Sequence, residues 1–161
     1  MPRPVPKPSR EEKRQMRSAS RLFAVQALFQ MEQSGQPMPE VREQFETHRF
    51  GAELDGETYS EGDVDLFRAT LSEALDRQAT IDQATDRALV ERWPLGKIDP
   101  TLRALFRAAG AEIAGLDTPP KVVITEYVDV AKAFFPDGKE PRFVNAVLDH
   151  MAREIKPDAF S

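Results

Sequence analysis

The chain has 161 residues, of which 40% are hydrophobic and 30% are charged, and it contains no cysteine. This length and apolar content suit one folded domain, or two small lobes with a shared core, and they exclude wholesale disorder. The lack of cysteine excludes disulfides, thiol nucleophiles and thiolate metal sites. No apolar run reaches the ~18 residues of a membrane span, and no secretory signal follows the basic N-terminus. We therefore expect a cytoplasmic protein with no membrane partner.

Charge is distributed unevenly along the chain, whose formal net charge is −5. The first 21 residues hold seven basic and two acidic side chains, a net charge of +5, whereas the other 140 residues carry −10. The acids are densest between Glu32 and Asp65, where there are ten acids and only two arginines. A basic segment on an acidic body indicates two different binding faces. A solvated tail on an ordinary acidic protein is the alternative interpretation.

The N-terminal segment predicts an arm followed by a long helix. Proline alternates through the first eight residues, so residues 1–8 should form an extended, flexible basic arm that carries Arg3 and Lys7. Ser9 and Glu12 then form a capping box. Apolar residues recur at helical spacing from there, and the helix should end at Ser34–Gly35.

Six more helices are predicted along the rest of the chain. Their start signals are capping side chains, or prolines that suit a first turn. They lie at Pro39, Asp63, Thr80, Asp99, Thr118–Pro120 and Pro141. The glycine-rich acidic stretch 51–62 reads as a solvated loop, and Trp93–Gly96 should close the fourth helix after about Glu91. No segment shows sustained period-two alternation, so the fold class is all-α, with about seven helices.

Catalytic motifs are absent from the sequence. His48 and His150 are far apart and each stands alone, without metal-ligand spacing. Gly96-Lys97 resembles the end of a phosphate loop, but Glu91 occupies the position where that loop needs glycine. We therefore expect neither an enzyme nor a bound metal or cofactor.

Four arginines form a stripe at the start of the long helix. Arg10, Arg14, Arg17 and Arg21 are spaced by four, three and four residues, which places them on one face. Guanidinium groups pair with phosphate oxygens at two points, so such a stripe suits a nucleic-acid backbone. A solvated helix face neutralised by nearby glutamates is the alternative.

A second basic cluster lies where the last helix begins. Lys132, Lys139 and Arg142 surround a helix N-terminus, which itself favours phosphate. Phe143 is a candidate for stacking on a base, although it equally suits core packing. Asn145, the only asparagine in the chain, is a candidate for contacting a base edge.

Three segments carry a resemblance to a known family. Arg21–Phe29, Pro120–Lys132 and Phe143–Asp149 resemble, in order and spacing, the motifs of the NusB family of bacterial transcription antitermination factors. The arginine cluster is less consecutive here than in the family, Phe29 replaces a tyrosine, and Ala146 replaces a glycine.

The resemblance implies a fold and a function. It implies two roughly perpendicular helical bundles in one domain over residues 9–161, with lobes at about 9–79 and 80–157 and a basic groove between them. It also implies binding of boxA RNA of ribosomal RNA transcripts, together with the ribosomal protein NusE, in the RNA polymerase antitermination complex. The protein would be a monomer or a weak homodimer. The positions that match family RNA contacts are Arg14, Arg17, Arg21, Lys139, Arg142, Phe143 and Asn145.

Two other functions remain open at this point. A NusB-like domain also opens some ribosomal RNA cytosine methyltransferases, so the chain could be a fragment of one. It could also be a helical adaptor that binds protein and not RNA, an interpretation with which the acidic stretch Glu32–Asp65 is compatible.

Overall fold

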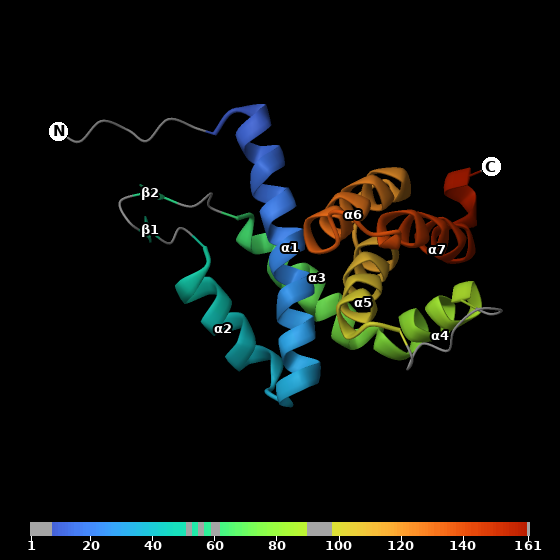
Figure 1. Ribbon diagram of the computed structural model, residues 1–161, viewed down its shortest axis with the longest axis horizontal. Coiled ribbons are helices and arrows are strands. Elements are labelled where there is room, and N and C mark those ends of the chain that lie inside the picture. The colour runs from blue at the N-terminus through green and yellow to red at the C-terminus, as the bar shows by residue number, and fades with distance from the viewer. Residues whose placement is uncertain (1–7, 51–52, 55–56, 59–61, 90–97, 161) are drawn as a thin grey trace.

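The computed structural model describes residues 8–50, 53–54, 57–58, 62–89 and 98–160 (Figure 1). Predictions for Arg3, Lys7, Glu91 and Trp93–Gly96 lie outside these residues. The helices are α1 (Arg10–Ser34), α2 (Met38–His48), α3 (Val64–Asp76), α4 (Gln78–Leu89), α5 (Pro100–Gly115), α6 (Pro120–Phe134) and α7 (Glu140–Ile155). A short 3₁₀ helix, Pro157–Phe160, follows α7. The predicted all-α fold class is confirmed.

Most helix ends lie where the sequence predicts them. The Ser9 hydroxyl accepts a hydrogen bond from the backbone of Glu12, and Asp63 and Asp99 cap α3 and α5 in the same way. Gly35 ends α1 in the left-handed conformation, with φ of 74°, which glycine adopts without steric cost. These ends depend on local chemistry, which explains why the sequence predicts them.

Two local predictions are wrong. Thr80 does not cap α4, because the helix begins at Gln78 and Thr80 lies within its first turn. Only Arg77 separates α3 from α4, and its backbone is bonded on both sides, to Glu73 at 3.0 Å and to Ile81 at 2.9 Å. The expected loop at 51–62 also contains a minimal antiparallel pair, β1 (Glu53–Leu54) with β2 (Glu57–Thr58).

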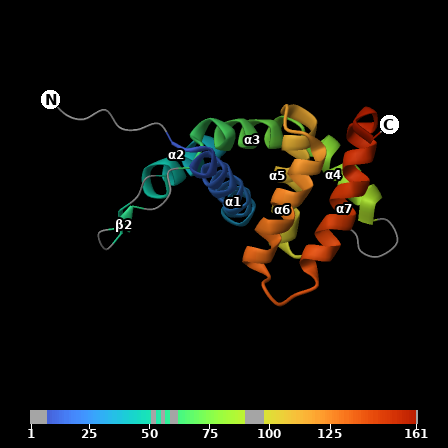
Figure 2. The ribbon, with the colours of Figure 1, turned by 90° about the horizontal axis from the view of Figure 1, so that it is seen from above.

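Helix α5 is the centre of the fold. It packs against α1, α3, α4, α6 and α7, and it lies between α1 and α4 in both views (Figures 1 and 2). Its buried residues include four alanines and Gly110. A Cβ added at Gly110 would lie 2.5 Å from Cγ2 of Ile81, so glycine is needed for α4 to approach this closely.

The N-terminal helices are joined by packed aromatic rings. Phe23 of α1 contacts Phe50 edge-on, with ring centres 5.1 Å apart, and Phe50 contacts Phe67 of α3 at 5.0 Å. Phe45 of α2 lies 5.9 Å from Phe67. Such pairs add to the burial of apolar area, so they hold α2 and α3 against α1. No helix of the described residues is both long and apolar enough to cross a membrane.

Candidate nucleic-acid interface

The first three arginines of the predicted stripe lie on the surface of α1. Arg10, Arg14 and Arg17 are exposed over the first two turns of the helix. Within the described residues these three arginines make one ion pair, a loose one in which Arg14 lies 3.9 Å from Glu11 on the same helix. Exposed pairs of this kind contribute little to stability, so their guanidinium groups are able to bind an anionic partner.

Arg21 differs from the other three because its side chain is only 3% exposed. Its Nε donates to Oε1 of Glu112 at 2.9 Å and one terminal nitrogen donates to Oε2 at 2.8 Å. Burial by itself lowers the pKa of Arg21, but the hydrogen bond and charge of Glu112 outweigh it, so this pKa is raised. A guanidinium in this position cannot reach a phosphate in solvent. The prediction that Arg21 contacts RNA is therefore corrected to a structural role.

The same ion pair extends to α6. Arg21 lies 3.6 Å from Glu126, whose carboxylate also accepts a hydrogen bond from the Ser18 hydroxyl at 3.1 Å. The next residue of α6 is Tyr127, whose hydroxyl is buried with no hydrogen-bond partner among the described residues. Burial, and the charge of Glu112 next, raise the pKa of Tyr127 well above its ordinary value. The network therefore joins α1, α5 and α6.

The second predicted cluster lies around the start of α7. Lys139 and Arg142 are exposed, and Asn145 is exposed one turn further along the helix. Phe143 is half-buried, and its ring packs edge-on against Phe106 of α5, with centres 6.0 Å apart. One face of Phe143 therefore belongs to the core. Lys132, near the end of α6, is exposed and lies 3.7 Å from Asp129.

A groove separates the two clusters. It lies between α1 and α6, which are side by side in both views (Figures 1 and 2), and has a volume of about 240 Å³. Its lining consists of Ser18, Ala19, Leu22, Glu126, Asp129, Val130 and Ala133. Arg17 directly precedes the first lining residue and Lys132 directly precedes the last. The family resemblance implied a basic groove. The lining of this groove contains no basic residue, and the basic residues are next to the lining residues in the sequence.

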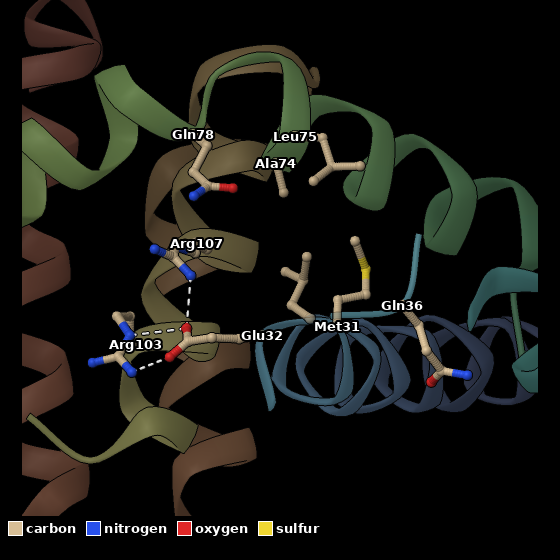
Figure 3. Close-up of a pocket in the computed structure, with 9 residues that line it drawn as sticks. Met31, Glu32, Gln36, Ala74, Leu75, Gln78, Arg103 and Arg107 are labelled. Atoms are coloured by element: carbon tan, nitrogen blue, oxygen red, sulfur yellow. Dashed lines mark hydrogen bonds and ion pairs between the residues drawn. The ribbon is translucent and has the colours of Figure 1, made fainter. Parts of the chain in front are cut away.

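A second cavity, of about 340 Å³, lies between the far end of α1, α3–α4 and α5 (Figure 3). Glu32 of α1 accepts hydrogen bonds from Arg103 and Arg107 of α5, and Arg107 also binds Asp82 of α4 at 2.9 Å. The hydrogen bond from Arg103 lowers the pKa of Glu32 and outweighs burial, which acts in the opposite direction. This network was not predicted from the sequence. The four-residue spacing of Arg103 and Arg107, which places both on one face of a helix, was the only sequence signal for it. No cluster suited to a metal ion occurs among the described residues.

Comparisons with known proteins identify relatives of this chain. The sequence profile of the NusB family matches residues 18–153. The Transcription antitermination protein NusB of Agrobacterium fabrum is 45% identical over 89% of this chain and 87% of its own length. The protein of the same name from Maricaulis maris is 43% identical over 93% of this chain and 94% of its own length.

Solved structures show the same fold. The structure of T. maritima NusB has a TM-score of 0.68 and 24% sequence identity, and the match covers 97% of this chain and 99% of that one. A chain from the crystal structure of the antitermination factors NusB and NusE in complex with dsRNA has a TM-score of 0.69 and 20% identity. That match covers 87% of this chain and 98% of the other.

Proposed function

The chain belongs to the NusB family, and from this premise we propose that it is a non-catalytic transcription antitermination factor that binds boxA RNA of ribosomal RNA transcripts together with NusE. It would act in the RNA polymerase antitermination complex, as a monomer or a weak homodimer. The names of the relatives support antitermination, and one structural neighbour contains NusB, NusE and RNA.

One observation carries the RNA-binding part of the proposal: exposed cations lie on both sides of the α1–α6 groove. Arg14 and Arg17 lie on the turns of α1 that lead to it. On the other side of the groove, Glu126 of α6 contacts Ser18 of α1. From Glu126, α6 continues for only eight residues to its end at Phe134, a length of about 12 Å. Lys139 and Arg142 follow at the start of α7.

The two sides suit the phosphates of a single strand that crosses the groove. Guanidinium groups bind phosphate oxygens at two points, and the first turn of α7 adds backbone N–H groups. We retain Arg10, Arg14, Arg17, Lys139 and Arg142 as phosphate contacts, and Phe143 and Asn145 as contacts to bases. Arg21 is left out because its side chain is buried against Glu112.

The test is a fluorescence titration of a short boxA RNA, with and without NusE, over a series of salt concentrations. Arg17→Gln and Arg142→Gln should each weaken binding. Each should also flatten the slope of log affinity against log salt by about 0.7, as the loss of one phosphate contact on a single strand requires. Arg87→Gln, at an exposed arginine of α4 that pairs with Glu154, is the matched control.

The control should bind like the unaltered protein, and all variants should keep their helical circular dichroism. If both Arg17→Gln and Arg142→Gln bind RNA normally, the proposed site is wrong. If the protein binds NusE but no RNA, with or without NusE, it is a protein-only adaptor.

A further inference from the structure

We propose that the α1–α6 groove holds one base of the bound RNA and that Asp129 selects a base that presents an exocyclic amino group. This inference rests on the proposed function. It adds a base-binding pocket and a specificity-determining residue to the phosphate contacts and to the base contacts of Phe143 and Asn145 proposed above.

The walls of the groove suit a flat, largely apolar ring. Leu22 on one side and Val130 on the other present aliphatic surface, while Ala19 and Ala133 are small enough to leave the space between them open. The volume of about 240 Å³ lies below the usual ~300–1,000 Å³ of pockets for drug-sized ligands. It therefore suits a fragment such as one base, and bases taken out of a stack pack well between apolar side chains.

The two acidic side chains of the groove, Glu126 and Asp129, are hydrogen-bond acceptors, and the third polar side chain, Ser18, donates to Glu126. Glu126 already accepts from Ser18 and lies against the Arg21 guanidinium. Asp129 has a side chain that is 54% exposed, and within the described part of the chain it forms an ion pair with Lys132, at 3.7 Å. A carboxylate of this kind accepts a hydrogen bond from the amino group of cytosine. It repels uracil, which presents a carbonyl oxygen at the same position.

The charges around the groove favour RNA as its occupant. Exposed Arg17 is next to the lining residue Ser18 on α1, and exposed Lys132 is next to the lining residue Ala133 on α6. Each helix of the groove therefore carries a cation, so phosphates can be bound on both sides of a base in the groove. When no base occupies the groove, the negative charge of Asp129 repels the phosphates that Arg17 and Lys132 attract. A bound amino group turns the carboxylate into a favourable contact.

The experiment uses short RNAs of one length in which each position in turn is cytosine, uracil or abasic. Binding to the full chain is followed by fluorescence anisotropy at several salt concentrations. At one position, cytosine should bind at least about 5-fold tighter than uracil, the lower end expected for a specific base contact. Asp129→Asn should abolish that preference, because an amide both donates and accepts, and should leave the preferences at all other positions unchanged.

Two matched controls separate the groove from general effects. Asp149→Asn removes the same charge from α7, where Asp149 is similarly exposed and pairs with Arg153 at 3.0 Å. It should leave the preference intact. Ala133→Leu should fill the groove and weaken binding of RNA, but not of RNA that is abasic at the selected position. Ala79→Leu makes the same substitution at an exposed site on α4. It should change neither the binding of the intact RNA nor that of the abasic RNA.

The outcomes distinguish this inference from the function on which it rests. If RNA binds with the expected salt dependence but no position prefers cytosine, or if Asp129→Asn strengthens all RNAs equally, the base pocket is wrong and the proposed function stands. If no RNA binds at any salt concentration, the proposed function itself fails. Helical circular dichroism of each variant confirms that it folds.

Discussion

Arg21 of α1 and Glu112 of α5 form an ion pair inside the protein, with two parallel hydrogen bonds of 2.9 and 2.8 Å. Both side chains are almost completely buried, at 3% and 0% exposure. Eleven residues further along α1, Glu32 pairs with Arg103 and Arg107, which precede Glu112 on α5. The two contacts therefore fix α1 and α5 in antiparallel register.

Removal of one partner of the buried pair should destabilise the protein strongly. Arg21→Met leaves the Glu112 carboxylate buried without its cation, which typically costs about 3–5 kcal/mol. In a chain of this size that loss should lower the Tm by about 10 °C or more. Thermal and urea denaturation measure it.

The double variant Arg21→Met, Glu112→Met is the control for this prediction. It removes both charges and should recover most of the lost stability. If it is as unstable as Arg21→Met alone, the effect comes from packing rather than from the unpaired charge.

Gly110→Ala should destabilise the junction of α5 and α4. The added Cβ would lie 2.5 Å from Cγ2 of Ile81, and overpacking of this kind costs about 1–3 kcal/mol. Gly115→Ala is the matched control on the same helix, because its Cβ would meet only the flexible Glu73 side chain. Urea denaturation should show a clear loss for the first variant and little or none for the second.

A double-mutant cycle tests the cause. In the Ile81→Ala background, the clashing methyl group is gone, so Gly110→Ala should cost much less than in the unaltered protein. Equal costs in both backgrounds would mean that the contact with Ile81 does not explain why glycine is needed.

The Glu32 network should stabilise the protein only while Glu32 is ionised. Because the pKa of Glu32 is lowered in the folded state, its contribution is present above the ordinary value of 4.5 and is lost as the pH falls through the folded pKa. Glu32→Gln should therefore lower the free energy of unfolding by about 1 kcal/mol at pH 7. The difference from the unaltered protein should shrink as the pH falls below 4.5.

Urea denaturation between pH 7 and pH 3 measures this difference. Glu43→Gln, at an exposed glutamate of α2, serves as the control and should change stability little at any pH. A destabilisation by Glu32→Gln that is the same at pH 7 and pH 3 would contradict the assignment.

The arginine stripe shows how far the sequence can predict the candidate site. Helical spacing correctly places Arg10, Arg14, Arg17 and Arg21 on one face of α1. It does not show that α5 and α6 cover this face only from Arg21 onward, where Glu112 and Glu126 lie 91 and 105 positions away in the chain. The first three arginines are therefore exposed and the fourth is internal.

Thr80 illustrates the same distinction for the fold. It has the sequence of a helix cap, with Gln83 three residues later. However, the backbone of α3 passes into α4 through Arg77, so no free helix end remains for Thr80 to cap. The true caps at Ser9, Asp63 and Asp99 are each directly preceded by a residue that is not helical.

The sequence alone determined the all-α class, most of the helix ends that the structure describes and the two places where cations gather. Each depends on residues within a few positions of one another, through backbone hydrogen bonds, caps and helical periodicity. Tertiary structure decided which cations face solvent, which acids neutralise the others and where the α1–α6 groove opens. Those properties depend on which helices pack together, and burial turns an arginine that would bind a phosphate in water into half of an internal ion pair.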